Sequence, residues 1–436
     1  MTDLVAAVVD GRVLALRAAG SLVLPEVPRG DDGPDLAALA AVCGARTVRP
    51  LAPELRPDPA ADVRLHVVRP VPAPADGVVL DPRALDELSA PTAVVEVLAA
   101  ELAVLAGRAP RPDRRADWYR AGWQDEADGW VDEALAARGV RRTGPSVPVK
   151  IWSLSALLRV PTTDGDVVLK AVGDPFAAEP AVTRWLSAAL PGQVPTVLAV
   201  ELRRGWTLMR AFSGSDGGDH PGSGPVAARV LAQVQLTATE RLDSLRATGL
   251  PDRSLSRTLE ALADVVRDGT VLRGLDPEER ARVTALPAWL APRFAALDAV
   301  GLPPSLVHGD LHTANYGVTA DGVLLFDWTD AALGHPALDT VLLASSAGQD
   351  DPALEQDTLA AWAETWSAAY PEADVTAALA LAPAAHLAYQ AVSYYGLGRA
   401  QEDASRWQLG GITARLLRRL LTLQDTNPSP SYAITF

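Results

Sequence analysis

Cysteine is nearly absent from this chain of 436 residues, since Cys43 is the only one. A single cysteine excludes an internal disulfide and a metal cluster built from cysteine thiolates. Lysine is almost as rare, because Lys150 and Lys170 are the only lysines among 39 basic residues. The remaining lysines are therefore of interest, because an ammonium group is a compact charge that suits a phosphate oxygen in a tight site.

The chain also has little net positive charge and no long apolar run. Its formal net charge is −15, and the one locally basic stretch is Arg108–Arg115. Nucleic-acid binding needs a larger clustered basic surface. No run reaches the roughly 18 apolar residues of a membrane span, and the first residues lack a signal-peptide pattern. We therefore expect a soluble, cytoplasmic protein without nucleic-acid or membrane partners, whose negative surface favours cationic small molecules.

The first 110 residues are predicted to form a separate N-terminal α/β cap domain. Strand and hairpin signals begin at Leu4–Val9 and Val13–Ala18, and helical patterns occur at Leu36–Val42 and Thr92–Ala106. The segment DGRVLALRAAGSLVLPEV resembles the opening strands of a Nudix domain, which makes a degenerate Nudix-like cap one interpretation. The acidic metal-binding helix of that family is missing, so we infer no hydrolase activity.

Residues 116–212 have the pattern of a β-rich unit. A helix is expected from Ala116 to about Gly139, with its tryptophans as packing anchors. Three consecutive antiparallel strands should follow, and then a helix and two further strands. The five expected strands are Val147–Trp152, Ala156–Val160, Asp166–Val172, Thr196–Glu201 and Trp206–Arg210.

Residues 213–436 are predicted to be mainly helical. Ser213–Gly224 is rich in glycine and is interpreted as a flexible connector, because no strand and helix of a P-loop surround it. Pro287 and Pro292 are expected to break the third helical stretch. The helical stretches are Ala227–Leu245, Leu255–Arg267, Pro277–Leu297, Ala353–Ala369, Val375–Leu397 and Gly411–Gln424.

The strongest chemical signal lies in SLVHGDLHTANYGVTADGVLLFDW. Asp310 and Asn315 are five positions apart, and Asp327 follows an apolar strand at Val323–Phe326. A hairpin between them should bring Asp327 back beside Asn315. Phosphoryl transfer requires such a set, because one carboxylate orients the attacking hydroxyl while an amide and a second carboxylate hold Mg²⁺.

This block resembles the aminoglycoside phosphotransferase-like kinases, whose catalytic loop reads HGDxHxxN before a strand that ends in Asp. The resemblance implies an α+β, protein-kinase-like two-lobed fold, with a small lobe at 116–212 and a helical large lobe at 213–436. It also implies ATP and a pair of Mg²⁺ ions as cofactors, Asp310 as catalytic base, and Asn315 and Asp327 as metal ligands. Asp339, in GHPALD, would be structural. The matching loop residues are His308, Gly309, Asp310, His312 and Asn315.

Two residues are expected to form the lysine–glutamate pair of the nucleotide site. Lys170 ends the third small-lobe strand, where related kinases keep the lysine that contacts the α- and β-phosphates. Glu179 would be its ion-pair partner by analogy. Pro180 requires Glu179 to lie in the first turn of the next helix.

Two further segments are expected to contact the nucleotide. Ser153 and Ser155 stand where protein kinases carry a glycine-rich loop, and their small side chains would let the backbone approach phosphate. Met209 and Ala211 belong to the segment that should meet the adenine edge.

Several residues near the motif have alternative interpretations. His308 and His312 have metal-ligand spacing, but no third ligand is in step with them, so hydrogen bonding that shapes the loop is favoured. Asp330 and Asp339 could bind substrate, and Asp339 is better interpreted as a helix N-cap.

The acceptor is expected to be a small-molecule hydroxyl, with a cationic molecule such as an amino sugar favoured. Aminoglycosides, glucosamine, choline and homoserine all serve related kinases. A protein kinase is disfavoured because no long activation loop fits between Asp327 and Asp339. A nucleotide-binding pseudokinase is the other alternative. Most of the C-terminal aromatic residues should pack the core, although they could stack on a sugar: Trp362, Trp366, Tyr389, Tyr394 and Tyr395.

Overall fold

The computed structural model describes residues 2–18, 20–29, 35–74 and 77–426. Its contacts divide the chain into two compact units. The first contains residues 1–173 and 399–408, and the second contains residues 174–398 and 409–436. This division does not test the predicted domain boundaries near residues 110 and 212, which stay predictions.

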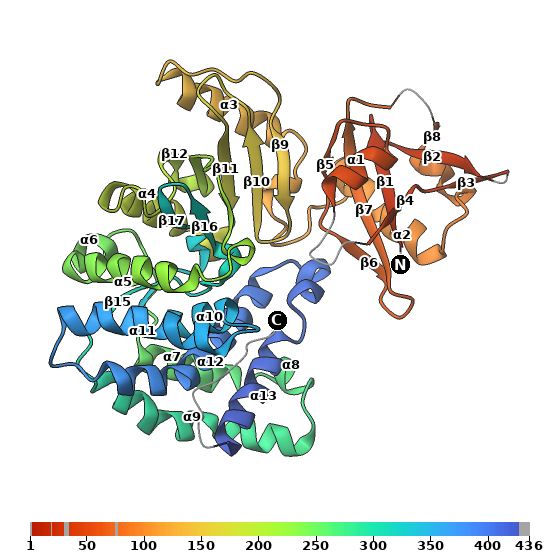
Figure 1. Ribbon diagram of the computed structural model, residues 1–436. Coiled ribbons are helices and arrows are strands. Elements are labelled where there is room, and N and C mark those ends of the chain that lie inside the picture. The colour runs from red at the N-terminus through yellow and green to blue at the C-terminus, as the bar shows by residue number, and fades with distance from the viewer. Residues whose placement is uncertain (1, 19, 30–34, 75–76, 427–436) are drawn as a thin grey trace. The chain divides into compact units, whose positions relative to one another are not determined.

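The N-terminal part of the first unit is a mixed sheet with helices, shown in red and orange in Figure 1. The strand order is β3-β2-β1-β7-β5, with β4 on β1, β6 on β7 and β8 on β2. The β1–β7 pair is parallel and the other pairs are antiparallel. The elements are β1 (Thr2–Val9), β2 (Arg12–Ala18), β3 (Ser21–Val23), β4 (Glu26–Pro28), α1 (Leu36–Val42), β5 (Thr47–Pro50), β6 (Leu55–Asp58), β7 (Val63–Val71), β8 (Val78–Leu80), η1 (Pro82–Glu87) and α2 (Thr92–Leu105).

Alternate residues of β1 enter two different apolar clusters. Val5 belongs to the cluster that contains Leu39 of α1, whereas Ala6 belongs to the cluster that contains Leu98 of α2. Successive side chains of a strand point to opposite faces of the sheet, so each face is covered by a different helix. The α/β character expected for residues 1–110 is therefore present.

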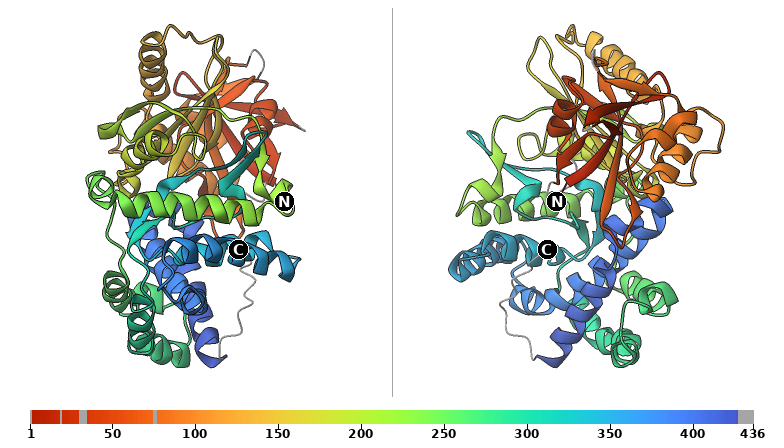
Figure 2. Two further views of the ribbon diagram at one scale, coloured as in Figure 1. Left: turned by 60° about the vertical axis from the view of Figure 1, so that its left-hand side comes forward. Right: turned by 90° about the vertical axis from the view of Figure 1, so that its right-hand side faces the viewer.

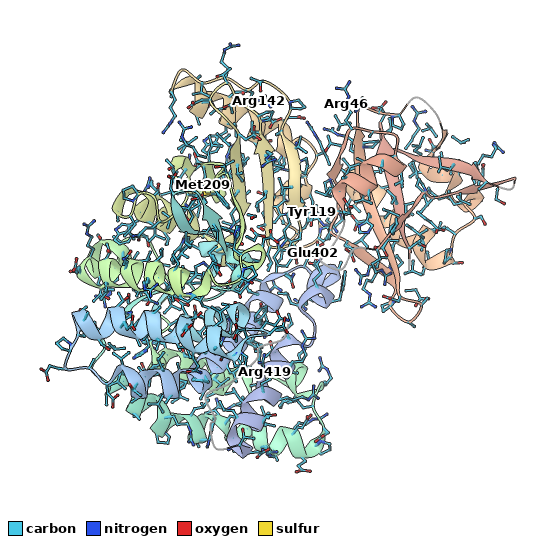
Figure 3. The ribbon with its side chains drawn as sticks, viewed as in Figure 1. Arg46, Tyr119, Arg142, Met209, Glu402 and Arg419 are labelled. Atoms are coloured by element: carbon cyan, nitrogen blue, oxygen red, sulfur yellow. The ribbon has the colours of Figure 1, made fainter. Side chains whose placement is uncertain are left out.

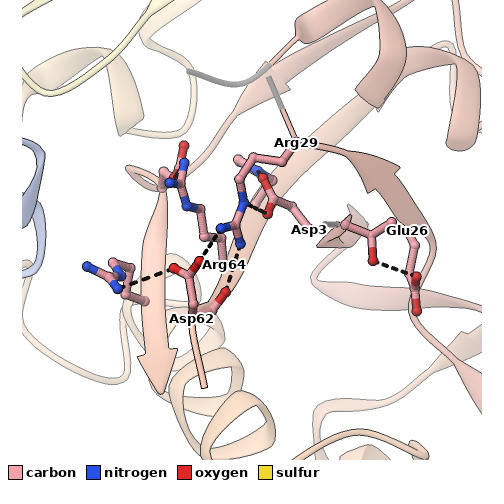
Figure 4. Close-up of polar contacts among 9 residues, drawn as sticks. Asp3, Glu26, Arg29, Asp62 and Arg64 are labelled. Atoms are coloured by element: carbon pink, nitrogen blue, oxygen red, sulfur yellow. Dashed lines mark hydrogen bonds and ion pairs between the residues drawn. The ribbon is translucent and has the colours of Figure 1, made fainter. Parts of the chain in front are cut away.

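A partly buried polar network joins β1, β7 and the residues that follow β4 (Figure 4). Arg29 donates from Nε to Asp3 Oδ1 at 2.7 Å and from Nη2 to the Asp62 carbonyl at 2.7 Å. His66 Nε2 lies 3.2 Å from Asp3 Oδ2. Burial alone would raise the pKa of Asp3, but the bonds to His66 and Arg29 overcome it and lower the pKa below its ordinary value. The network satisfies charges that burial would otherwise penalise.

The remaining elements of the first unit confirm the predicted three-strand run. β10 pairs antiparallel with both β9 and β11, and Lys170 lies opposite Leu157. The helix expected over 116–139 is instead split, because Gly122 adopts φ +82°. Trp118 and Trp123 are buried, as expected of packing anchors. The elements are η2 (Asp117–Tyr119), α3 (Trp123–Ala136), β9 (Val147–Ile151), β10 (Ser155–Val160), β11 (Val167–Val172) and η8 (Asp403–Leu409).

The second unit is mainly helical around one large apolar core. Helices α5 and α11 run side by side, as Figures 1 and 2 show. Its N-terminal elements are η3 (Asp174–Phe176), α4 (Glu179–Ala189), β12 (Val197–Glu201), η4 (Leu202–Arg204), β13 (Trp206–Arg210), β14 (Ser215–Asp216), η5 (Gly217–Asp219), α5 (Gly224–Glu240), α6 (Leu242–Arg246), α7 (Leu255–Val265), α8 (Gly269–Leu272) and α9 (Pro277–Asp298). Its later elements are β15 (Ser305–Val307), η6 (Thr313–Asn315), β16 (Tyr316–Thr319), β17 (Gly322–Leu325), η7 (Trp328–Asp330), β18 (Ala332–Gly334), α10 (Leu338–Ala347), α11 (Pro352–Ala369), α12 (Val375–Ala400) and α13 (Ile412–Asp425).

The prediction that prolines break α9 is wrong. The helix runs through Pro287 and Pro292 without interruption. A proline in a helix interior removes one backbone hydrogen bond and costs about 3 kcal/mol. The buried stripe of Leu286, Leu290 and Phe294 offsets that cost, because packing of an apolar face supplies most of a helix's stability in proteins.

The segment Ser213–Gly224, interpreted above as a flexible connector, contains a short strand. Within it, β14 pairs antiparallel with β16, placing Ser215 opposite Val318 and Asp216 opposite Gly317. The segment thus adds a strand to the hairpin that carries Asn315 and Asp327. Its glycines fit this role, because a Cβ at Gly214 would collide with the Val318 carbonyl.

Helix α12 is long and apolar enough to cross a bilayer by length and composition. However, 67% of its most apolar window is buried inside the protein. Leu387 and Tyr389 are among the residues that enter the core. Burial of this kind is typical of a core helix.

Candidate active site

The loop that carries the HGDLHTAN motif begins at the buried His308, directly after β15. Strand β15 pairs with β18, which fixes both ends of the segment that contains the motif. The His308 ring accepts from the Asp310 N–H through Nδ1 at 3.4 Å, and Nε2 lies 2.9 Å from the Phe326 carbonyl. Because a carbonyl only accepts, Nε2 carries the proton. His308 thus ties the loop to the end of β17, as the loop-shaping interpretation proposes.

His312 has a similar local role. Its Nδ1 accepts from the Ala314 N–H at 3.2 Å and caps the short helix η6. Its Nε2 lies 3.8 Å from Asp310 Oδ2. Both histidines therefore use ring nitrogens to shape the loop rather than to form a joint metal site.

Asp339 lies in the first turn of α10 and stabilises the loop by hydrogen bonds to its backbone. Its buried carboxylate accepts from the His308 N–H at 2.7 Å and the Gly309 N–H at 2.9 Å. Gln235 Nε2 adds a third donor at 3.2 Å. The N-cap interpretation is wrong, because Ala337 is the N-cap and Asp339 points away to the loop. Burial raises the pKa of Asp339 to about 7, although these three donors oppose the rise.

Replacement of Asp339 by asparagine should loosen this support. The amide nitrogen cannot accept a hydrogen bond, so either the His308 or the Gly309 N–H would be left buried and unpaired. We expect about 1–3 kcal/mol less unfolding free energy, measured by denaturant titration. Turnover should fall as well. Asp321→Asn, at the exposed hairpin turn, is the matched control, and an Asp339→Asn protein as stable as that control would refute the assigned role.

Asp310 and Asn315 lie together at the two ends of the loop. Asn315 Nδ2 donates to the Asp310 carbonyl at 2.7 Å and lies 3.4 Å from Asp310 Oδ2. Gly309 lets the loop pass close to Asp330, since it has φ +87° and a Cβ there would collide with the Asp330 carbonyl. The amide nitrogen of Asn315 faces Asp310, which leaves its amide oxygen as the group able to bind a cation.

Asp327 is brought to the same place by the predicted hairpin. β16 and β17 pair with Tyr316 opposite Leu325, and the Phe326 N–H donates to the Asn315 carbonyl at 3.0 Å. Asp327 itself has φ +63°, a left-handed conformation that is uncommon for a residue with a side chain. Thr329 Oγ1 donates to Asp327 Oδ1 at 2.7 Å and fixes the carboxylate. Such strain is typical of functional positions.

The charges of this site repel one another. Burial raises the pKa of Asp310 well above its ordinary value, and the carboxylates of Asp330 and Asp327 raise it further. Carboxylate and amide oxygens are the ligands that Mg²⁺ prefers, and a divalent cation would offset the repulsion. The donor set of Asn315 and Asp327 therefore fits Mg²⁺.

Sequence reasoning missed the role of three residues in supporting this loop. Gln390 Nε2 donates to the Gly309 carbonyl at 2.5 Å, and the Tyr389 hydroxyl donates to the Asp330 carbonyl at 2.9 Å. Gln235 donates to Asp339 and accepts from two tryptophans. No local sequence pattern distinguishes these residues. Each lies within a helix that its apolar spacing already predicts, and that spacing indicates no further role for them.

The expectation that most of the C-terminal aromatic residues pack the core is confirmed for Trp362 and Trp366. Both are fully buried and donate from Nε1 to Gln235 Oε1, at 2.8 Å and 3.2 Å. Tyr389 is buried as well, and the Tyr395 hydroxyl donates to Asp268 at 2.7 Å. Tyr394 is half-buried, and burial followed by the charges of Asp310 and Asp330 raises its pKa. Tyr394 is thus the aromatic residue of this group that is influenced by the charge of Asp310 while keeping exposed surface.

The nucleotide residues predicted in the second unit have clear positions. Glu179 is the first residue of α4, the position that Pro180 requires of it. Its side chain is buried. Met209 and Ala211 are half-buried at the end of β13. The next residue, Phe212, packs on Phe326 with ring centroids 5.2 Å apart. The expected adenine segment is therefore fixed beside the residue that precedes Asp327.

The other predicted nucleotide residues belong to the first unit. Lys170 is buried in β11. The Ser155 hydroxyl accepts from the Trp152 indole at 2.9 Å, and the Ser153 hydroxyl bonds to Gln401 and Gln408. The functional assignments of all these residues stay predictions.

Comparison with known proteins identifies the family. Residues 152–375, just over half of the chain, match the model of the phosphotransferase enzyme family (APH). No curated protein matches the sequence. Among solved structures, an aminoglycoside 2'-phosphotransferase-IIIa mutant in complex with GDP has a TM-score of 0.52 at 16% identity, covering 69% of this chain and 99% of that one. This likeness shows the protein-kinase-like fold.

Two other solved structures are similar at lower scores. Choline kinase LicA from Streptococcus pneumoniae has a TM-score of 0.48 at 14% identity, covering 69% of this chain and 100% of that one. Macrolide 2'-phosphotransferase MphH from Brachybacterium faecium has a TM-score of 0.44 at 21% identity, covering 65% and 97%. On the extent of the family match, this chain belongs to the phosphotransferase enzyme family.

Proposed function

We propose that this protein transfers the γ-phosphoryl group of ATP to a hydroxyl of a polar small molecule. The observation that carries the proposal is the joined geometry of Asp310, Asn315 and Asp327. Asn315 bonds to Asp310 through its side chain and to Phe326, the neighbour of Asp327, through its backbone. A base and two oxygen ligands for a cation thus share one rigid support within a chain of a phosphotransferase family.

The proposed chemistry assigns one role to each residue. Asp310 accepts the proton of the acceptor hydroxyl as the hydroxyl oxygen forms a bond to the γ-phosphorus, and ADP departs as the bond to the β-phosphate oxygen breaks. Asn315 and Asp327 would hold Mg²⁺, which neutralises phosphate charge when bound. His308, Gln390 and Asp339 keep the loop in place, so positioning is set before the substrate binds.

An amine-containing acceptor is favoured by the charges around Asp310. The carboxylates of Asp327 and Asp330 lie close enough to Asp310 to raise its pKa. A cationic group on the acceptor would relieve this repulsion where Mg²⁺ does not reach. A polyhydroxylated amine, such as an amino sugar or an aminoglycoside, combines the two required groups.

The proposal is tested by ADP release over a panel of amino sugars, aminoglycosides, choline and neutral sugars. We expect release that requires both one of these acceptors and Mg²⁺, and that stops when EDTA removes the metal. Phosphorylation of generic proteins without turnover of any panel member would favour a protein kinase. Nucleotide binding without any release would favour a pseudokinase.

Lys170→Met should raise the apparent KM for ATP and lower kcat. A buried lysine charge near the phosphates contributes more than a solvated one, and its loss should lower kcat/KM for ATP roughly 10–100-fold. Arg159→Met is the matched control, because Arg159 is an exposed cation on the adjacent strand, 3.4 Å from Asp166. If both variants had the same kcat/KM in a steady-state ATP titration, Lys170 would not be part of the nucleotide site.

A further inference from the structure

The turn between β9 and β10, Trp152–Ser155, is fixed within the first unit by hydrogen bonds from tryptophan and glutamine side chains. The Trp152 N–H donates to the Ser155 carbonyl at 3.1 Å, and the Trp152 indole donates to Ser155 Oγ at 2.9 Å. Trp118 Nε1 donates to the Trp152 carbonyl at 2.7 Å. On this side, hydrogen bonds from two tryptophans and within its own backbone therefore stabilise the turn.

The other side of the turn is held by two glutamines from far along the chain. Ser153 Oγ donates to Gln408 Oε1 at 2.6 Å and accepts from Gln401 Nε2 at 2.5 Å. Gln401 Nε2 also lies 3.4 Å from Gln408 Oε1. The hydroxyl proton of Ser153 therefore points to Gln408, so in this arrangement it does not donate to a phosphate oxygen.

Residues 399–408, which carry both glutamines, are anchored to the N-terminal part of the same unit. Arg115 Nε donates to Glu402 at 2.8 Å, and its two terminal nitrogens bond to Glu101 at 2.5 Å and 2.9 Å. All three residues are buried. Figure 3 shows Glu402 close to the buried Tyr119, which follows Trp118. Removing Arg115 would leave two buried carboxylates without their cation, so the arrangement is strongly specified.

A second anchor lies at Trp407, next to Gln408. The guanidinium carbons of Arg56 and Arg64 lie 5.2 Å and 5.1 Å from the Trp407 ring centroid. Arg64 is itself fixed by Glu54 at 2.9 Å. The cavity lined by Glu54, Trp152 and Gln408 has a volume of only about 20 Å³. Such a space holds about one water molecule, so the turn has little room to shift toward the N-terminal sheet.

We propose that Gln401 and Gln408 are positioning residues, which hold Ser153 and so preset the Trp152–Ser155 turn for Mg²⁺–ATP. The inference rests on the proposed function and on the prediction that this turn, with Ser153 and Ser155, lies against the phosphates of ATP. Because the glutamines are anchored by Arg115 and Trp407, the N-terminal domain acquires a role: it keeps the nucleotide turn in its binding conformation. A preset turn loses less conformational entropy when the nucleotide binds.

The test is calorimetric titration of Mg²⁺–ATP into full-length Gln401→Leu, Gln408→Leu and Ser153→Ala proteins. Each change removes the same clamp, so each should raise the Kd about three- to tenfold. Combining Ser153→Ala with Gln408→Leu should add little, because both act through one hydroxyl. In turnover assays the KM for ATP should rise while kcat stays nearly constant. Ser153→Thr, which keeps the hydroxyl, should restore the wild-type Kd.

The controls separate positioning from general destabilisation. Gln233→Leu makes the same change at an exposed glutamine, 2.8 Å from Gln193 in the second unit, and should leave the Kd unchanged. Melting temperatures identify any variant that is misfolded, in which case Gln408→Asn serves as the smaller change. Wild-type Kd in both glutamine variants overturns the inference, as does a loss confined to Ser153→Ala. Absence of Mg²⁺–ATP binding by the wild-type protein instead overturns the proposed function itself.

Discussion

Asp310→Asn is expected to abolish detectable phosphoryl transfer while Mg²⁺–ATP affinity stays close to the wild-type value. Asparagine keeps the size of the side chain and one acceptor oxygen but cannot take up the proton of the acceptor hydroxyl. Loss of a general base or positioning group typically costs ~10²–10⁴-fold in rate. The nucleotide should bind normally, because removing one of three mutually repelling carboxylates does not remove a metal ligand.

Asp321→Asn provides the matched control for this variant. Asp321 lies exposed at the β16–β17 turn, in the same hairpin region but away from the loop. Its activity should equal that of wild type. An active Asp310→Asn protein, or one whose loss of activity is matched by loss of nucleotide affinity, would show that Asp310 is not the base.

Asp327→Asn should instead weaken both Mg²⁺-dependent nucleotide binding and turnover. Asparagine tolerates the left-handed conformation at φ +63° better than most residues, and its oxygen can still accept from Thr329. The backbone is therefore preserved while the charged ligand is lost. Substitution of a residue that only supports a metal ligand typically lowers metal affinity roughly 10–100-fold. Substitution of a direct ligand should lower the affinity at least as much.

Dependence on Mg²⁺ concentration distinguishes the two aspartates. Raising Mg²⁺ should partly restore ATP binding and activity in Asp327→Asn but should not restore activity in Asp310→Asn. Calorimetric titrations at several Mg²⁺ concentrations measure the first effect, and turnover assays measure the second. Identical Mg²⁺ responses of the two variants would mean that the roles are wrongly divided.

Much of the fold was predictable because its signals are local. The hairpin that joins Asn315 to Asp327 follows from the Ala320–Gly322 turn between Tyr316–Val318 and Val323–Phe326, and the structure forms it as predicted. The three strands up to Lys170 were predictable for the same reason. Local rules failed where tertiary contacts decide the outcome. The apolar face of α9 overrides two prolines, and pairing with β16 orders a glycine-rich segment.

The support of the candidate site could not be predicted, because its partners lie far apart in sequence. Asp339 has the pattern of a helix cap, yet its carboxylate bonds to two N–H groups about 30 residues earlier. Gln235 and Gln390 look like ordinary helix residues. Their roles depend on which carbonyls and carboxylates the fold brings within about 3 Å, as hydrogen bonds require. The motif identified the residues proposed to take part in the reaction, but not the residues whose hydrogen bonds keep them in position.

Phosphorus NMR of the reaction products is the most direct measurement of the central claim. Wild-type protein, Mg²⁺, ATP and the acceptor selected by the ADP-release panel would be incubated beside Asp310→Asn. We predict that wild type converts ATP to ADP and one new phosphate ester on a hydroxyl of the small molecule, and that Asp310→Asn forms neither. Free phosphate in place of an ester, or equal ester formation by Asp310→Asn, would contradict an Asp310-dependent transfer to a small-molecule hydroxyl.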